Sequence, residues 1–494
     1  MATISSHGVK SFSLVSDDWI PVAYISGHKL VSLSRLFEDA ADIQDVVLPP
    51  LERVAIMRLL ICITHAALNG PKKKQDWLSC RDRIQPEVKA YLQKWCARLN
   101  LFGYHPFLQI ANLQPASNTL PLDKLNLAWA SGNNHTLFDH QALTGERKIP
   151  YSDLARCLLV IQCFHPGGLC SNVVWNGQKI EKSTNQAPCV ESGALLSILI
   201  GSNLLDTIHL NLVPEDRLDK IPFGRPIWEF DPPPFPGSQE AKAFVRSYLG
   251  RLVPFSRAIC IFPNNRGCVI GKGLEYPKLP ESREPMATVV TKSTRGKEEL
   301  CYLRAVHGQH PWRELHSVLM TGQVTKSGGP VSLLNLKELY QSDTDRIVNL
   351  WVGGLSADRA KLEEVQEYIF SFNLTFLGET ALEIYRKGVD NARDQESALK
   401  YAADTYLARL GIAKEVKNKL MPRIMSAYWS LLDNHYRTLI STAEEGGKLD
   451  NWDMLCFKTA EKAYSELCPA TTPRQIRAFI EGYRRLVRCK KKKE

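Results

Sequence analysis

The sequence predicts an α+β protein: a large mixed N-terminal domain with long loops, residues 1–374, followed by a C-terminal antiparallel bundle of about four helices, residues 375–494. Three observations support this class. The 494 residues exceed a typical domain of ~150 residues several-fold, so at least two hydrophobic cores are expected. Before about Asn373, short β-rich runs alternate with helical stretches and proline-rich loops. Beyond it, apolar residues recur at the three- and four-residue spacing of helices.

The expected strands of the N-terminal domain are short runs rich in β-branched and aromatic residues. Among them are FSLV, TIHLNLV, RAICIF and ATVVT, at residues 12–15, 207–213, 257–262 and 287–291. Proline-rich stretches such as FDPPPFPGSQE, residues 230–240, predict long loops.

The C-terminal region predicts helices of similar length. They are expected at Ser397–Lys419, Pro422–Ala443, Trp452–Cys468 and Thr472–Cys489, and the segment Gly378–Val389 would extend the first of them. Gly446-Gly447 and Pro469 lie in the joins between helices. Because the connections are short, neighbouring helices are expected to run antiparallel.

The last predicted helix is amphipathic and basic. Thr472 is a plausible N-cap and Pro473 suits the first helical position. One apolar stripe would contain Ile476, Phe479, Ile480, Tyr483, Leu486 and Val487. The net charge of the chain is +10, and residues 472–494 supply +7 of it. Candidate phosphate contacts are Arg484, Arg485, Arg488, Lys490, Lys491, Lys492 and Lys493; the alternative is a solvated helix end with a lysine tail.

Composition excludes several classes. The chain is 44% hydrophobic and 23% charged, which is ordinary for a soluble protein. Its apolar run at 56–68 carries Arg58 and His65, and its N-terminus has neither a long apolar stretch nor an Arg-rich amphipathic pattern, so we expect a cytoplasmic protein without membrane spans. The thirteen cysteines form no CxxC pair and are expected to be reduced thiols. Cys163 and Cys170, with His165 between them, could hold zinc only with ligands from elsewhere.

Catalytic machinery is not evident. The chain has no GxSxG, GxxxxGK[ST] or HExxH motif and no GxGxxG after a strand, and no cofactor is expected. In SGNNHTLFDHQ, residues 131–141, His135, Asp139 and His140 could bind a metal or transfer protons, although the polar, turn-rich context is more typical of a surface loop. Asp17 and Asp18 could form a carboxylate pair or serve a turn. An enzyme with an unrecognised site is therefore the less favoured alternative.

Taken in order, several segments resemble a known family. They are FSLVSDDWIPV, LLICITHAAL, NLFGYHPFLQ, SGNNHTLFDHQ, the Pro-Gly-Gly turn at 166–168, LLDTIHLNLV and the late helices. Their order and spacing are similar to those of the large subunit of the type I-E CRISPR Cascade complex, the CasA family, over nearly the whole chain.

The resemblance implies a non-enzymatic subunit of an RNA-guided surveillance complex, with the CRISPR RNA and the other Cascade subunits as partners. Such a subunit binds double-stranded target DNA, detects the protospacer-adjacent motif, starts strand separation and R-loop formation, and helps recruit a helicase-nuclease. Base pairing with the guide RNA recognises the target sequence, whereas the protein recognises only the short adjacent motif. A nucleic-acid-binding scaffold outside CRISPR systems is the alternative.

The resemblance also implies motif-reading residues. By order along the chain, the glycine loop with which the family enters the minor groove falls on Pro166 with Gly167 and Gly168. A groove about 6 Å wide leaves little room for side chains beside the backbone, which suits glycine. A lysine probe falls on Lys272, at an expected Gly-Lys-Gly tip, with Arg266 as substitute, and an aromatic position falls on Phe138. An ordinary turn and a solvated lysine are the structural alternatives.

A strand-separating wedge is implied at a predicted hairpin. Apolar runs at 351–352 and 365–372 flank Gly353-Gly354, Ser356 and Asp358, which predict a projecting turn. The wedge falls on Arg359 and Ala360, where the arginine could stack on an exposed base pair. The alternative is a surface loop in which Arg359 pairs with Glu363 or Asp358.

Overall fold

The structure, a computed structural model, describes residues 11–115, 118–129, 148–165, 170–181, 190–191, 193–263, 266–294, 296–320, 327–339, 346–358 and 361–491. The chain divides into two compact units. The N-terminal unit comprises residues 1–307, 321–341 and 348–371, and the helical unit comprises residues 308–320, 342–347 and 372–494. Both units are discontinuous in sequence, whereas the predicted domains were continuous, because the segment at 308–320 packs with the late helices.

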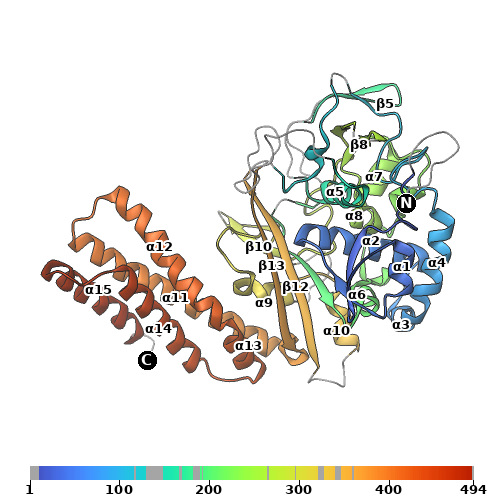
Figure 1. The fold of residues 1–494 in the computed structure, drawn as a ribbon. Coiled ribbons are helices and arrows are strands. Elements are labelled where there is room, and N and C mark those ends of the chain that lie inside the picture. The colour runs from blue at the N-terminus through green and yellow to red at the C-terminus, as the bar shows by residue number, and fades with distance from the viewer. Residues whose placement is uncertain are drawn as a thin grey trace. The chain divides into compact units, whose positions relative to one another are not determined.

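The strands of the N-terminal unit form several small sheets rather than one large one (Figure 1). Their orders are β2-β1-β3, β4-β5-β6, β13-β12-β7, β8-β9 and β10-β11. The strands are β1 (Ile20–Tyr24), β2 (Gly27–Val31), β3 (Ile43–Val46), β4 (Gln114–Pro115), β5 (Val173–Trp175), β6 (Gln178–Ile180), β7 (Leu196–Ile200), β8 (Arg257–Ile261), β9 (Cys268–Lys272), β10 (Val289–Thr294), β11 (Lys297–Tyr302), β12 (Ile347–Asp358) and β13 (Lys361–Asn373).

Two of the four expected strands are present and two are not. RAICIF forms β8 and ATVVT contributes to β10. TIHLNLV does not form a strand, because most of it lies in helix α6 (Leu204–Asn211), whose first turn is capped by Asn203 Oδ1 accepting from Asp206 N at 2.9 Å. Because this helix is buried on nearly all sides, its apolar residues do not recur at the helical spacing that would distinguish it from a strand. In FSLV, only Ser13 makes an isolated bridge, to Asn100.

The helices of the N-terminal unit surround a central buried helix, α2. They are α1 (Leu33–Glu38), α2 (Pro50–Leu68), α3 (Lys74–Ser79), α4 (Ile84–Trp95), α5 (Tyr151–Phe164), α6, α7 (Gln239–Arg246), α8 (Tyr248–Leu252) and α10 (Leu333–Leu339). Within α2, the side chain of Arg58 is fully buried in an ion pair with Glu284, and its Nε donates to Leu252 O at 2.9 Å. Paired polar groups thus let this apolar helix form a protein core. Among the described residues, no helix combines the length and apolarity that a bilayer crossing requires.

The helical unit confirms the predicted C-terminal helical region, with changed boundaries. Its helices are α9 (Leu315–Leu319), α11 (Glu379–Arg409), α12 (Lys414–Leu432), α13 (Tyr436–Glu444), α14 (Asp450–Leu467) and α15 (Pro473–Lys491). The extension from Gly378–Val389 is confirmed, because α11 is continuous. The predicted break near residue 420 is wrong: the chain turns at Gly411, which has a positive φ of 66°, and α12 continues through Pro422.

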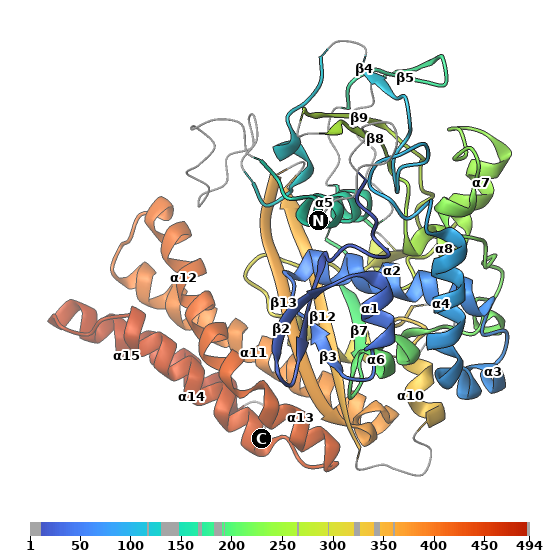
Figure 2. The ribbon, with the colours of Figure 1, turned by 45° about the vertical axis from the view of Figure 1, so that its right-hand side comes forward.

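Helix α15 packs antiparallel along α11, and Figure 2 shows the two helices side by side. Arg474 Nη2, in the first turn of α15, donates to Leu410 O at 2.9 Å, and a Cβ on Gly482 would lie 2.6 Å from Ala402 O. The cap is confirmed, since Gln475 N donates to Thr472 Oγ1 at 3.2 Å.

The predicted apolar stripe of α15 is only partly buried. Leu486 is buried, but Ile476 and Ile480 are 43% and 45% exposed. Small residues, Ala478 and Gly482, form the buried face instead, because they allow close approach of the neighbouring helices.

Candidate nucleic-acid interface

The predicted glycine loop follows helix α5, whose last residue is Phe164. Residues 166–169, with Gly167 and Gly168, lie outside the described part of the chain. The loop's first anchor, His165, is described. Its Nδ1 lies 3.1 Å from Arg257 Nη2. Because an arginine nitrogen can only donate, His165 Nδ1 accepts and the imidazole is neutral. Burial, and then the adjacent guanidinium, lowers the pKa of His165 to about 3.

Arg257 also lies beside the predicted lysine probe. In the antiparallel β8-β9 pair, Arg257 is the register partner of Lys272. The start of β8 is held to α5 by Gln162, whose Nε2 donates to Arg257 O at 2.9 Å while its Oε1 accepts from Arg257 N at 2.9 Å. His165, at the stem of the glycine loop, and Lys272 lie about a hundred residues apart in sequence. The tertiary structure places both of them next to Arg257.

The expected Gly-Lys-Gly tip is wrong. Lys272 is the last residue of β9, at the end of the pair away from its connecting turn. A Cβ on Gly271 would meet Val173 at 2.5 Å, and one on Gly273 would meet Arg257 N at 2.5 Å, so both glycines serve close packing. The Lys272 side chain is 28% exposed and forms an ion pair with Glu275. Arg266 is exposed and lies in the connection between β8 and β9.

The predicted hairpin around residue 359 is present and longer than expected. Strand β12 ends at Asp358 and β13 begins at Lys361; Arg359 and Ala360 lie between these ends in the sequence, outside the described residues. Gly353 and Gly354 do not form the turn, because both lie within β12. A Cβ on Gly353 would lie 2.7 Å from Gln366 O, and one on Gly354 would lie 2.9 Å from Ala194 O.

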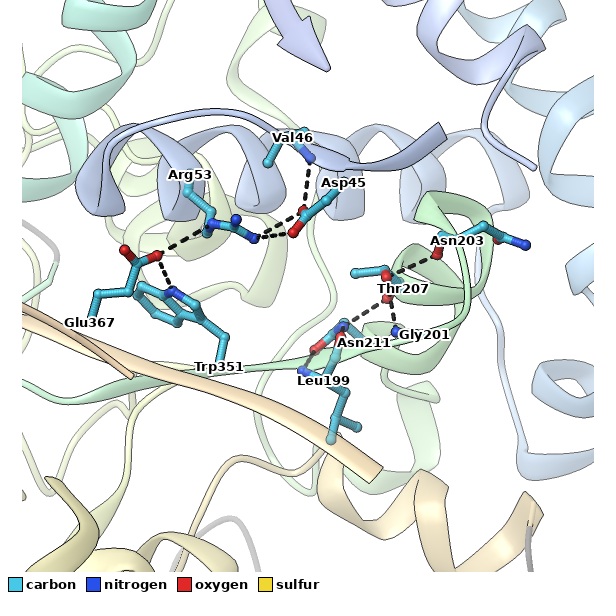
Figure 3. A network of polar contacts seen from close by, with 10 residues as sticks. All are labelled: Asp45, Val46, Arg53, Leu199, Gly201, Asn203, Thr207, Asn211, Trp351 and Glu367. Carbon is cyan, nitrogen blue, oxygen red and sulfur yellow. Dashed lines mark hydrogen bonds and ion pairs between the residues drawn. The ribbon is translucent and has the colours of Figure 1, made fainter. Parts of the chain in front are cut away.

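A chain of polar contacts fastens this hairpin to the N-terminal core (Figure 3). Trp351 Nε1 on β12 donates to Glu367 Oε1 on β13 at 2.6 Å, and Glu367 Oε1 lies 3.5 Å from Arg53 Nε on α2. Arg53 Nη1 also contacts Asp45 Oδ2 at 2.8 Å. The neighbouring strand β7 is held to α6, where Asn211 Oδ1 accepts from Leu199 N at 3.0 Å. The stem of the hairpin thus has a fixed base.

Two of the predicted phosphate contacts on the basic helix α15 are exposed to solvent. Arg484 and Arg485 are exposed and make no ion pair within the described part of the chain. Arg488, Lys490 and Lys491 belong to α15, but their side chains lie outside the description, as do Lys492 and Lys493 entirely.

The candidate catalytic and metal residues fall partly outside the described part of the chain. No group of three or more His, Cys, Asp or Glu suited to a metal occurs among the described residues. Phe138, His135, Asp139 and His140 lie outside them. Asp17 serves a turn, since its Oδ2 accepts from Ser13 N at 2.8 Å. Burial raises the pKa of the Cys163 thiol to about 11 and also raises that of Cys170.

Sequence reasoning did not identify the residues that connect these parts. Gln162, Arg257, Trp351 and Glu367 lie within apolar runs that predicted only helices or strands, and Arg53 belongs to no motif. The available signal was a polar residue inside each apolar stretch, since a buried polar group requires a partner.

Comparisons with known proteins agree over nearly the whole chain. The model of the family described as CRISPR-associated protein Cse1 matches residues 13–464. A CasA/Cse1 protein from Thermus thermophilus is 29% identical, with 96% of each chain covered. The solved structure of Thermus thermophilus CasA (Cse1) has a TM-score of 0.77 at 25% identity and covers 97% of this chain and 98% of that one. Thermobifida fusca Cse1 has a TM-score of 0.78 at 21% identity, with coverages of 97% and 98%. A chain of a structure described as a CRISPR RNA-guided surveillance complex has a TM-score of 0.76 at 18% identity, with coverages of 97% and 99%.

Proposed function

The chain belongs to the family described as CRISPR-associated protein Cse1, and from this premise we propose that it is the non-catalytic large subunit of an RNA-guided CRISPR surveillance complex. It would act in the cytoplasm with a CRISPR RNA and the other Cascade subunits. Its fold resembles a chain of a structure described as such a complex.

Within that complex, we assign this chain the recognition of the protospacer-adjacent motif in duplex DNA. The observation that carries this role is the position of Arg257, which contacts the stem of the glycine loop through His165 and pairs in register with Lys272. Two probes that are separated in sequence would then reach one stretch of minor groove. Backbone amides and a long cation suit that groove, because both can donate to its acceptors.

Strand separation is assigned to the hairpin of β12 and β13. A wedge must withstand the force of unstacking, which costs a few kcal/mol per step, so its base must be rigid. The contacts of Glu367 with Trp351 and Arg53 supply such a base. The positive residues of α15 would hold phosphates, and the opened complex would recruit a helicase-nuclease.

The experiment reconstitutes the complex with and without this chain and measures binding to a library of duplexes. All duplexes carry one protospacer and differ only in the adjacent bases. We expect binding that depends on the adjacent bases and requires both this chain and the guide RNA. Binding that ignores the adjacent bases would contradict motif recognition, and equal binding without guide RNA would favour a scaffold outside CRISPR systems. Turnover of DNA by the isolated chain would contradict a non-catalytic role.

A further inference from the structure

The N-terminal unit contains a cavity of about 190 Å³ that the proposed motif-reading and strand-separating residues do not use. Its walls come from the loop at 104–112, from the β5-β6 turn, from residues 227–233 and from Phe255. Strand β5 follows the glycine loop along the chain, and Trp175 at its end lines the cavity. The cavity therefore belongs to the same unit as the proposed motif-reading loops.

Three side chains on the walls lack partners. The side chains of Tyr104, Asn112 and Asn176 make no hydrogen bond within the described part of the chain. Tyr104 is 86% exposed, so its ring is available for stacking. The charged residues of the wall instead satisfy one another: Asp231 pairs with Arg98 at 2.5 Å and lies 3.7 Å from His105.

The backbone that lines the cavity is strained at one residue, Leu108. Leu108, Asn112 and Asn176 all line the cavity and have positive φ angles of 52°, 61° and 49°. The conformation is unusual for leucine, whereas asparagine adopts it readily, as Asn176 does in the Asn-Gly turn between β5 and β6. Strain of this kind is retained where surrounding contacts impose it, often at binding sites. Here Gln162 Nε2 donates to Leu108 O at 3.1 Å, so the residue that anchors β8 also holds this loop.

The wall chemistry selects a neutral, flat ligand with donors and acceptors. The interior is aromatic, with Phe107, Trp228 and Phe230, whereas the free polar groups are two amides and a phenol. An anion is disfavoured, because the guanidinium on the wall, that of Arg98, is already paired with Asp231. A cavity of about 150 Å³ can hold a benzene ring, so this one holds a single six-membered ring with its substituents.

We propose that this cavity binds one unpaired nucleobase of pyrimidine size from single-stranded DNA, with Tyr104 stacking on it and Asn112 and Asn176 reading its edge. Asparagine amides suit the donor and acceptor pattern of base edges, and aromatic side chains supply sequence-tolerant stacking. The inference rests on the proposed function, since strand separation beside the target produces unpaired bases. An aromatic side chain of a partner protein would fit the same volume but would leave the two amides without matching groups.

The test uses the full chain and two fluorescein-labelled probes of equal length and charge: a decamer of deoxythymidine and a decamer of abasic sites. Anisotropy at fixed salt should show that the wild-type chain binds the thymidine decamer at least about fivefold more tightly, the lower end for stacking one base. The variant Tyr104→Ala/Asn112→Gly/Asn176→Gly should lose this difference and bind the abasic probe as the wild type does. Glycine is used because it tolerates positive φ.

The matched control is Asn69→Gly, which removes an amide at another residue with a positive φ, 48°, outside the cavity. It should retain the preference for thymidine. Equal binding of both probes by the wild type, or a preference that survives the triple variant, would overturn the proposal. So would competition by N-acetyl-tyrosinamide as strong as that by thymidine, which would indicate a protein side chain. Motif selectivity of the reconstituted complex is measured separately, so its loss would count against the proposed function and not against the cavity.

Discussion

Arg53 on α2 pairs with Glu367 on β13, with Nε 3.5 Å from Oε1, although more than three hundred residues separate them. The contact is electrostatic, since Arg53 Nε makes no hydrogen bond. It joins the outer strand of the long hairpin to the central helix of the N-terminal unit. The proposed wedge therefore projects from a strand pair whose base is held by this ion pair as well as by the backbone hydrogen bonds between the strands.

Replacing Arg53 should loosen the hairpin. We expect Arg53→Ala to increase hydrogen exchange in β12 and β13 and to slow R-loop formation on an intact duplex, because a wedge on a yielding base separates strands less well. The loss of stability should be about 1 kcal/mol, the scale of partly exposed ion pairs. Arg35→Ala, which removes an exposed ion pair with Asp39, is the control and should change neither quantity. Unaltered exchange in both strands would contradict the bracing role.

The wedge itself is tested by Arg359→Ala combined with Ala360→Gly. The variant should form R-loops slowly on an intact duplex and almost normally on a target opened beside the adjacent motif, because the unstacking work is then already done. Stopped-flow fluorescence of a base analogue in the target measures both rates. Ser371→Ala, at the other end of the hairpin, serves as the control. Equal defects on the two targets would show that these residues bind DNA or stabilise the fold rather than separate the strands.

The two motif probes should act on one site. Gly168→Val and Lys272→Ala should each weaken binding to correct targets by roughly 1 to 3 kcal/mol, the scale of a good base contact. His165, which precedes the glycine loop, and Lys272 both adjoin Arg257, so we expect the two effects to be non-additive in a double-mutant cycle. Lys292→Ala on β10 replaces an exposed lysine outside the proposed site. Normal discrimination between correct and wrong motifs in both variants, or a larger loss for Arg266→Ala, would argue against this placement.

Removal of Lys490 to Lys493 should weaken duplex binding without changing motif preference. Lysines that neutralise phosphates release counterions and read no bases, so the salt slope should fall by about 0.9 for each phosphate that is no longer neutralised. Titrations at several salt concentrations measure this slope. Deleting Glu494 alone provides the control. Unchanged affinity and slope would identify the tail as a solvated terminus.

Stability should fall at mildly acidic pH because of buried neutral histidines. Burial lowers the pKa of His65 to about 4, and its Nδ1 lies 2.7 Å from Gly70 O while its Nε2 accepts from Val213 N at 3.2 Å. The unfolded chain gains this proton below about pH 6.5 while the folded chain does not, so His65 alone makes the unfolding free energy drop by about 1.4 kcal/mol per unit as pH falls from about 6.5 toward 4.

Urea unfolding between pH 7 and 5 measures this slope. His65→Asn should reduce this slope by the share of one proton, whereas His28→Gln, at an exposed position, should leave it unchanged. An equal slope in all three proteins would show that other groups govern the acid response.

Local sequence patterns predicted those features that depend on neighbouring residues. The cap at Thr472 and the presence of a hairpin around residue 359 were predictable, because capping and strand alternation are local, although the two strands are longer than expected. The apolar run that forms most of α6 was wrongly predicted as a strand, because a helix buried on most sides has apolar residues at nearly every position rather than at helical spacing. The exposed Ile476 and Ile480 were wrongly assigned to the packed face, because small residues decide which face of α15 packs.

The sequence by itself determined the family resemblance, the mixed fold class, the late helices and the concentration of positive charge at the end of the chain. Only the tertiary structure decided which residues serve each loop: Arg257 between His165 and Lys272, Glu367 between Trp351 and Arg53, and the amides that face one cavity. The physical reason is that periodicity and capping act within a few residues. Buried polar groups, in contrast, find partners according to how distant elements pack, and that packing has no signature in any single segment.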